Sequence, residues 1–316
     1  MKTILVTGTA GFIFSNFVRK AYIEKWPYHI VGVDKIVQPY NLKNLNRDLH
    51  PNFYMGDIAD KQFMENVFRI ERPEYVINGA AESFVDHSIA SAIPFVHSNI
   101  LGTQVMVDLS VKYGVEKFIQ ISTDEVYGQL KSIDEIPWTE EDCMAPRNPY
   151  SATKASAELL VKAAIETHKL PAMITRCCNN YGGRQPVRNL IPVVIDSLMN
   201  NREIPIHGSG ANLREWIFVE DHNAAVMTVL EKGVLGETYN IGSGIEKTNI
   251  EMVDEISRLM ETIAMIKHVE DRKGHDFRYS VDCSKIKKLG WIPKVSFNDG
   301  IRKTISWYAA NPNFYV

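Results

Sequence analysis

Short apolar runs alternate with segments of helical spacing along the first half of the chain. The apolar runs predict buried strands, and they span residues 2–6, 29–33, 53–55, 75–78 and 118–121. The segments with helical spacing span residues 12–24, 61–69 and 94–113. This alternation predicts a parallel sheet with helices on both faces and a ligand bound across the carboxyl ends of the strands.

The second half of the chain opens with a strongly helical run from residue 150 to about 168, and a further strand follows at residues 172–176. Beyond that strand the pattern becomes a mixture of short strands, turns and amphipathic helices. We therefore expect an α/β fold: a Rossmann-type doubly wound parallel sheet in residues 1–178, with a returning segment near 214–242. A smaller mixed α/β C-terminal domain is expected in residues 179–316.

Composition limits the possible partners and location. The chain has 316 residues, 45% of them hydrophobic, which is enough for one large or two smaller domains. A formal net charge of −3 gives no reason to expect nucleic acid or an acidic membrane as a partner. No apolar run approaches the ~20 residues that cross a bilayer. We expect small molecules or proteins as partners.

The four cysteines lie at positions 143, 177, 178 and 283, without a C-x-x-C spacing and without a secretory leader ahead of them. Adjacent Cys177 and Cys178 would face opposite ways on a strand, so neither a shared disulfide nor a metal site is expected. A reducing, cytoplasmic location fits this usage.

The first predicted strand runs into a glycine-rich turn, TGTAGFIF, at residues 7–14. Strand, glycine turn and helix is the order of a dinucleotide site. Gly8 permits a tight turn, and Gly11 lets backbone N–H groups approach a pyrophosphate at the positive end of the helix. The third position, which is normally small, holds Phe14. We expect the helix to shift slightly and NAD still to bind.

The second predicted strand ends in Asp34, 26 residues after Gly8. An acid at this point accepts hydrogen bonds from the adenosine ribose hydroxyls and repels a 2′-phosphate, which favours NAD over NADP. The alternative is an aspartate that caps a loop. Small residues, Gly79, Ala80 and Ala81, follow the strand at 75–78 and fit a backbone that passes close to a ligand.

Two adjacent carboxylates, Asp124 and Glu125, follow the strand at 118–121. Neighbouring side chains on an extended strand point to opposite faces, so both can act on one substrate only if the chain turns after Thr123. Gly128 permits such a turn. The alternative is a solvated acidic loop, which is the usual environment of such a pair.

Tyr150 and Lys154 lie four residues apart, and hence on one face of the predicted helix. A nearby ammonium lowers the pKa of a phenol from about 10, so that Tyr150 can take a proton near neutrality. A solvated surface pair is the alternative. Arginines recur beside glycines in the second half, for example Arg214 and Arg272, and their guanidinium groups suit phosphate oxygens, although solvated surface is the usual role.

The chain resembles an extended short-chain dehydrogenase/reductase and, within that group, the nucleoside-diphosphate-glucose 4,6-dehydratases. The matching motifs cover nearly the whole chain, at residues 7–8, 11–13, 34–35, 41–45, 80–83, 122–128, 149–154, 179–182, 214–216, 239–242 and 271–276. Tyr-x-x-x-Lys marks the superfamily. Thr-Asp-Glu is the specific part, because sister epimerases and decarboxylases do not carry both acids there.

The resemblance implies 4,6-dehydration of dTDP- or UDP-glucose to the 4-keto-6-deoxy sugar. Tyr150, helped by Lys154, removes the proton of the sugar 4-hydroxyl while hydride moves from C4 to NAD, and the hydride later returns to C6. Glu125 takes the C5 proton, Asp124 protonates the departing 6-hydroxyl, and Thr123 steadies the 4-oxygen. Separate environments must set the two carboxyl pKa values apart.

The resemblance also implies two sets of binding residues and a homodimer through the helices around 94–113 and 150–168. The cofactor contacts are Gly8, Gly11, Phe12, Ile13, Asp34, Lys35, Asp57, Ile58, Ala80, Ala81, Ser98, Tyr150, Lys154 and Asn180. The substrate contacts are Ser83, Thr123, Asn179, Arg188, Asn189, Arg214, Asn249, Arg272 and His275.

The chain departs from the family pattern at Phe14, at Phe84 and His87, and over residues 183–189. Asn189 stands where a lysine commonly meets the nucleotide, and Arg188 is the candidate replacement for that charge. Thymine and uracil both remain open as the base. The alternatives are a 4-epimerase, a dehydratase of another nucleotide hexose, and a non-catalytic NAD-binding regulator.

Overall fold

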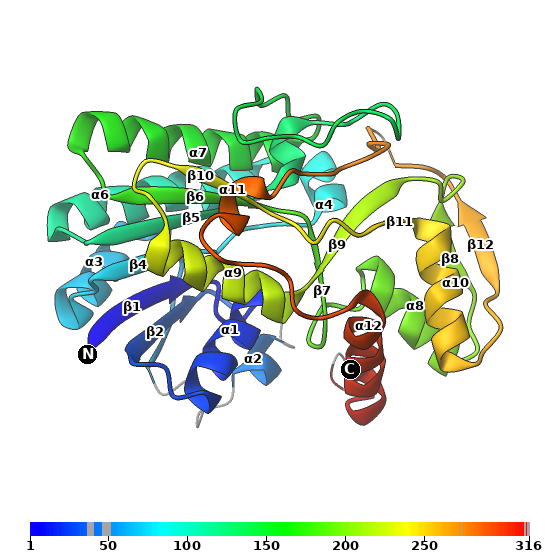
Figure 1. The fold of residues 1–316 in the computed structure, drawn as a ribbon. Coiled ribbons are helices and arrows are strands. Elements are labelled where there is room, and N and C mark those ends of the chain that lie inside the picture. Colours follow the sequence, from blue (N-terminus) through cyan, green and yellow to red (C-terminus); the bar gives the residue numbers. More distant parts are fainter. Residues whose placement is uncertain (37–40, 46–51, 273, 313, 315–316) are drawn as a thin grey trace.

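The computed structural model describes residues 1–36, 41–45, 52–272, 274–312 and 314 of the chain. Its centre is a seven-stranded sheet in the order β10-β6-β5-β4-β1-β2-β3, and every pairing in it is parallel (Figure 1). The strands are β1 (Lys2–Thr7), β2 (Tyr28–Asp34), β3 (Phe53–Met55), β4 (Tyr75–Asn78), β5 (Lys117–Thr123), β6 (Ala172–Cys177) and β10 (Thr238–Ile241). This sheet confirms the predicted α/β fold class.

Helices cover both faces of the sheet because successive strand residues point to opposite sides. Ile4 and Val6 pack with α1 (Phe12–Ile23), α9 (Val219–Lys232) and α11 (Ser284–Lys287) in one core. Leu5, between them, packs in a second core with α3 (Lys61–Glu71), α6 (Gly102–Tyr113) and α7 (Pro149–His168). In Figure 1, α7 lies above β5 and β6, and α9 lies below them.

The helix predicted over residues 94–113 is present, but a π-helical turn divides it. A short helix, α5 (Ile93–Phe95), leads into the π turn η1 (Val96–Leu101), and α6 follows. Ser98 lies in the π turn and is buried. Such turns leave no mark in apolar spacing, and they concentrate at functional sites.

The C-terminal half contributes two smaller sheets and a third apolar core. One sheet has the order β11 (Glu246–Thr248), β9 (Leu213–Phe218), β7 (Asn179–Tyr181), and the other pairs β12 (Ile266–Val269) with β8 (Ile204–His207). Three helices pack around these sheets: α8 (Leu190–Met199), α10 (Asn249–Met260) and α12 (Phe297–Ala310). Two further short helices lie in the N-terminal half: α2 (Asn41–Asn44) and α4 (Val85–Ala90).

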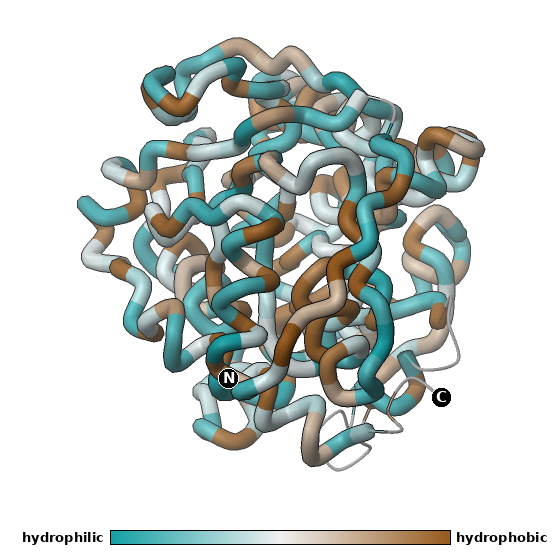
Figure 2. The backbone as a smooth tube through the Cα atoms, turned by 90° about the vertical axis from the view of Figure 1, so that its right-hand side faces the viewer, coloured by the Kyte–Doolittle hydropathy of each residue, from teal (hydrophilic) through white to brown (hydrophobic). Residues whose placement is uncertain are grey.

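Apolar and polar residues alternate along the tube in Figure 2, as amphipathic packing requires. Among the helices of the described residues, none is long and apolar enough to cross a membrane.

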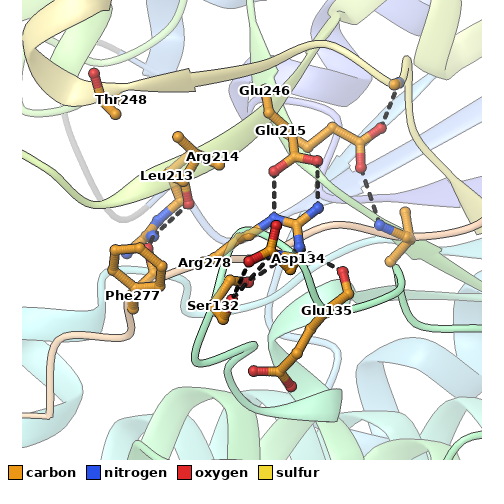
Figure 3. Close-up of polar contacts among 12 residues, drawn as sticks. Ser132, Asp134, Glu135, Leu213, Arg214, Glu215, Glu246, Thr248, Phe277 and Arg278 are labelled. Carbon is orange, nitrogen blue, oxygen red and sulfur yellow. Dashed lines mark hydrogen bonds and ion pairs between the residues drawn. The ribbon is translucent and has the colours of Figure 1, made fainter.

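The segment 276–282 joins the two halves of the molecule. Its residue Arg278 bridges to Leu130 on one side and to Leu213 at the start of β9 on the other. The Arg278 guanidinium binds both oxygens of Glu246 at 2.6 and 2.7 Å and the carbonyls of Ser132 and Glu135 at 3.3 and 2.7 Å (Figure 3). The loop after β5 is therefore fixed to β11.

Candidate active site

One pocket of about 710 Å³ lies at the carboxyl edge of the central sheet, between the two halves of the molecule. Its wall includes the glycine turn after β1, the ends of β4, β5 and β6, and segments of the C-terminal half. Every residue predicted above to act in catalysis or to bind cofactor or substrate lines this pocket. Residues far apart in the sequence therefore meet at the edge where a doubly wound sheet binds its ligand.

The glycine turn has the geometry that its sequence predicts. Gly8 has φ +82°, and a Cβ there would lie 3.0 Å from the Ala80 backbone, so any side chain would collide with the loop after β4. Gly11 is the residue immediately before α1, and its N–H donates to the Gly8 carbonyl at 3.0 Å. The amino end of α1 therefore opens into the pocket with little side-chain cover.

Asp34 closes the turn from the end of β2. Its carboxylate accepts the N–H groups of Ala10 at 3.0 Å and Ile36 at 2.9 Å. Burial raises the pKa of Asp34, against the effect of those donors. Asn44 of α2, which the sequence interpretation gave no role, donates to the Ala10 carbonyl at 2.8 Å from the other side.

Phe14 is buried at the start of α1 and lies against Gly79, where β4 ends. Its ring also meets the edge of Phe17, with the centroids 5.8 Å apart. The bulky residue at the third position of the turn is thus accommodated because Gly79, directly after β4, has no side chain.

The chain turns after Thr123, as both carboxylates require. Thr123 ends β5 and caps the 3₁₀ turn η2 (Asp124–Tyr127), where its Oγ1 accepts the Glu125 N–H at 3.3 Å. The same hydroxyl lies 3.2 Å from Asp124 Oδ1 and donates to it. Asp124 is buried and Glu125 is half-buried in the pocket wall, which argues against the solvated-loop alternative.

Burial raises the pKa of both acids, but the neighbours of each differ. The carboxylates of Glu125 and Glu215 add to burial and hold the pKa of Asp124 well above its ordinary value. The pKa of Glu125 is also raised by burial, but the Asn148 amide and the Arg214 guanidinium oppose the rise. Arg214 lowers the pKa of both acids, so the neighbours that differ are the two carboxylates beside Asp124 and the amide that binds Glu125. This difference in surroundings suits an acid at Asp124 and a base at Glu125.

The expected lowering of the Tyr150 pKa is wrong for this structure. Burial, followed by the Glu125 carboxylate, raises the pKa of Tyr150 well above its ordinary value. Burial lowers the pKa of Lys154 to about 8, and its ammonium donates to the Ile121 carbonyl at 2.6 Å. Desolvation thus sets the direction in which the Tyr150 pKa moves, an effect that helical spacing alone does not reveal.

Residues 5–304 match the protein family described as GDP-mannose 4,6 dehydratase. The chain belongs to this nucleoside-diphosphate-sugar 4,6-dehydratase family. The low-salt glycan biosynthesis protein Agl12 of Haloferax volcanii is 46% identical over 312 residues, which cover 96% of this chain and 98% of that protein. The dTDP-glucose 4,6-dehydratase of Neisseria gonorrhoeae is 42% identical over 336 residues, covering 98% and 96%.

A solved structure of the dTDP-glucose 4,6-dehydratase DesIV from Streptomyces venezuelae, with NAD bound, matches with a TM-score of 0.92 and 39% identity. The match covers 99% of this chain and 98% of that one. These findings confirm the predicted resemblance to the extended short-chain dehydrogenase/reductase 4,6-dehydratases.

The pocket of this 4,6-dehydratase fits NAD. The cradle at Gly8 is a space that a Cβ would fill, and Asp34 borders it at the end of β2. Deeper in the same pocket, the buried Ser122 Oγ and Asn180 Oδ1 have no hydrogen-bond partner within the described chain. Lys35 forms ion pairs with Glu82 at 3.0 Å and Asp57 at 3.9 Å beside this cradle.

The predicted substrate residues lie at the other end of the pocket. Arg188 lies over the ring of Phe84 at 4.4 Å, and Arg272 forms an ion pair with Asp86 at 3.1 Å. His275 Nδ1 lies 2.6 Å from Asp271 Oδ1. The other predicted substrate contacts on this wall are Ser83, Asn179, Asn189 and Asn249.

The Arg214 side chain is buried and fixed by contacts within the protein. It donates to the carbonyls of Leu213, Asp276 and Phe277 at 2.7 to 3.2 Å and stacks on Tyr279 at 4.6 Å. It therefore also fixes the wall of the pocket.

Three residues that the sequence interpretation missed shape this site. Asn148 donates to Glu125 Oε2 at 3.0 Å, and Asp276 and Tyr279 line the pocket beside it. Asn148 precedes Pro149, the ordinary pattern of a helix cap, so its capping role could have been found. The placement of Asp276 and Tyr279 depends on tertiary packing and has no local signal.

Proposed function

We propose that the protein is an NAD-dependent lyase that converts dTDP-glucose or UDP-glucose to the 4-keto-6-deoxy sugar by removing water across C5 and C6. The observation that carries this proposal is the position of Asp124 and Glu125 together in one pocket with Tyr150 and Lys154. Tyr150 and Lys154 alone would suit oxidation and re-reduction at C4. Two further acids are what an elimination needs.

Each side chain has a role that its surroundings support. Tyr150 is the proposed acceptor of the 4-hydroxyl proton, and this role requires its raised pKa to fall when positive charge is brought beside it. Lys154, one helical turn further along α7, and the nicotinamide ring of bound NAD would supply that charge. Glu125, whose carboxylate accepts the Asn148 amide, removes the C5 proton. Asp124, whose pKa is raised by burial and by the carboxylates of Glu125 and Glu215, protonates the departing 6-hydroxyl. Thr123 holds the 4-oxygen. When bound, NAD supplies a cationic nicotinamide ring that accepts hydride from C4 and returns it to C6.

The residues that would hold the cofactor follow the sheet edge from the glycine turn to Lys154. Gly8 and Gly11 would receive the pyrophosphate, and Asp34 would bind the adenosine ribose. The remaining contacts are Phe12, Ile13, Lys35, Asp57, Ile58, Ala80, Ala81, Ser98, Tyr150 and Asn180, all of which line the pocket.

The nucleotide diphosphate lies against the C-terminal half, where Arg272 and Arg188 provide charge. Arg188 replaces the charge that Asn189 lacks, and Phe84 supports its guanidinium by a cation–π contact. Ser83, Asn179, Arg214, Asn249 and His275 complete the substrate wall. Residues 1–178, with a returning part near 214–242, bind NAD, and residues 179–316 bind the nucleotide sugar.

The protein acts in the cytoplasm as a homodimer. Large apolar side chains stay exposed on η1 and on the two helices that the resemblance places at the subunit contact. They include Leu101 at 47% exposed, Val111 at 36% and Leu159 at 56%. Burying such a surface against its own copy is the simplest use of it.

A donor panel tests the proposed activity. Purified protein is incubated with dTDP-glucose, UDP-glucose, GDP-mannose and UDP-N-acetylglucosamine, and the alkaline absorbance of a 4-keto product is measured alongside product masses. We expect loss of one water from a glucose donor, and co-purified NAD in the mass spectrum of the protein extract. No product with any hexose donor would contradict the proposal, as would an epimer of unchanged mass.

A further inference from the structure

Glu125 is held by a residue that also organises the helix of Tyr150. The Asn148 Nδ2 group donates to Glu125 Oε2 at 3.0 Å. Its Oδ1 accepts the Ser151 N–H at 2.8 Å and so caps α7, two residues before Tyr150 in the first helical turn. One amide therefore fixes the position of the carboxylate relative to the phenol.

The residue next to Asn148 is held by a buried carboxylate from the other half of the molecule. Arg147 Nη1 lies 3.1 Å from Asp276 Oδ1, and the Asp276 side chain is 2% exposed. The second oxygen of Asp276 accepts the Tyr279 hydroxyl. Its backbone carbonyl accepts Arg214 at 2.9 Å and Asn212 at 3.1 Å. Asp276 is thus fixed on three sides.

Asp276 directly follows the segment that carries Arg272 and His275, the proposed diphosphate contacts. Gly274 in this segment lies close to the Arg147 backbone, because a Cβ on Gly274 would be 3.7 Å from the Arg147 carbonyl oxygen. The segment that carries the proposed diphosphate contacts is therefore connected to Glu125 through a continuous series of contacts.

We propose that Asp276, acting through Arg147 and Asn148, is a positioning residue that holds Glu125 for removal of the C5 proton. The inference rests on the proposed function and deepens it, because it makes the base depend on the segment that binds the nucleotide.

The charges around Glu125 predict the direction in which its pKa changes when the charge of Asp276 is removed. Arg214 and Arg272 lower the pKa of Glu125, and Asp276 raises it. Asp124, Tyr150 and Tyr279 are the other titratable groups beside it. Removing the charge of Asp276 therefore lowers the pKa of Glu125 and moves the acid limb of the kcat profile to lower pH.

The test compares the parent with Asp276→Asn, which keeps the side-chain shape and loses the ion pair. We expect kcat to fall about tenfold or more while KM and the Kd for dTDP or UDP change less than about twofold. Because C4 oxidation does not need Glu125, reduced nicotinamide should accumulate in a single turnover, and uptake of solvent deuterium at C5 should slow.

Arg147→Met is the second variant, since Arg147 is 40% exposed and its loss leaves no cavity. Arg147→Met should show the same fall in kcat, whereas Arg147→Lys should keep most of the parent kcat. The double variant Asp276→Asn, Arg147→Met should have a kcat no lower than that of either single variant. Arg202→Met removes an exposed ion pair with Asp196, neither of which lines the pocket, and should behave as the parent.

The outcomes separate the two proposals. A parent that is inactive with every donor overturns both. If the parent is active and Asp276→Asn has the same kcat, only the positioning role is overturned. The positioning role is also overturned if kcat, nucleotide affinity and melting temperature all fall together in this variant. A kcat defect with intact nucleotide binding and the stated pH shift supports it.

Discussion

The ring of Phe14 occupies the space that a side chain on Gly79 would need. A Cβ on Gly79 would lie 2.1 Å from Phe14 Cε2 and 2.6 Å from Cδ2, which is closer than any real contact. Phe14 is 3% exposed and packs with Ile77 and Ile121 in the core below the sheet. The large residue on α1 and the missing side chain after β4 therefore form a complementary pair.

This pair predicts a non-additive double-mutant cycle. Gly79→Ala should lower the free energy of unfolding by about 1–3 kcal/mol and weaken NAD binding, because the new methyl overpacks the ring. In a Phe14→Ala background the same substitution should cost much less, since the ring is gone. Urea unfolding and titration with NAD measure both effects. Equal costs in the two backgrounds would show that the residues are independent.

Glu125→Gln should separate elimination from oxidation. The variant keeps the Asn148 contact but cannot take the C5 proton, so we expect kcat for the 4-keto product to fall by about 10²- to 10⁴-fold. Reduced nicotinamide should build up after mixing with substrate, which stopped-flow absorbance detects. An epimerase would keep its activity in this variant, and that result would count against the dehydratase mechanism.

His222 predicts a pH-dependent loss of stability. It is fully buried in α9, and burial lowers its pKa from 6.5 to about 4. The unfolded chain therefore binds a proton that the folded chain does not, and stability falls as the pH drops from about 6.5 to 4. A shift of this size corresponds to about 3 kcal/mol. Urea unfolding of the parent and His222→Leu at several pH values should show a shallower acid decline in the variant.

Arg278 should be more important for stability than a surface ion pair. Arg278→Met leaves the Glu246 carboxylate and two loop carbonyls without their donor, and we expect a loss of about 3 kcal/mol in unfolding free energy. Arg278→Lys should recover little, because an ammonium cannot bind both Glu246 oxygens side by side. Limited proteolysis of the loop around residues 131–136 should quicken in both variants. The matched control is Arg258→Met, which breaks the exposed pair with Glu255.

The apolar residues of α7 predict how the subunits associate. Leu159→Arg places a charge in the proposed contact and should shift the protein to monomers in sedimentation or light scattering, with little change in secondary structure. Ile70→Arg, at an equally exposed apolar position (58%) on α3, serves as the control and should stay dimeric. Dimers in both variants would place the contact elsewhere.

Local patterns in the sequence were sufficient for β1 to β6 and for the glycine turn, because burial period and glycine geometry act within a few residues. They did not place β7 to β12, including β10 of the central sheet, because these strands are mostly short and are fixed by tertiary pairing. The Tyr150 pKa could not be predicted, since it depends on how completely α7 and the C-terminal half exclude water. The Phe14–Gly79 fit and the Asp276–Arg147 pair also arise only after distant segments pack together. The π turn before α6 changes hydrogen bonding without changing apolar spacing.

The position of β10 at one edge of the central sheet has a consequence for how the chain folds. Its residues, 238–241, are synthesised after β7, β8 and β9, and they pair with β6. Until they leave the ribosome, β6 has an open edge, and without α9 the core that contains Phe17 stays partly uncovered. A fragment that ends at residue 178 should therefore aggregate rather than bind NAD.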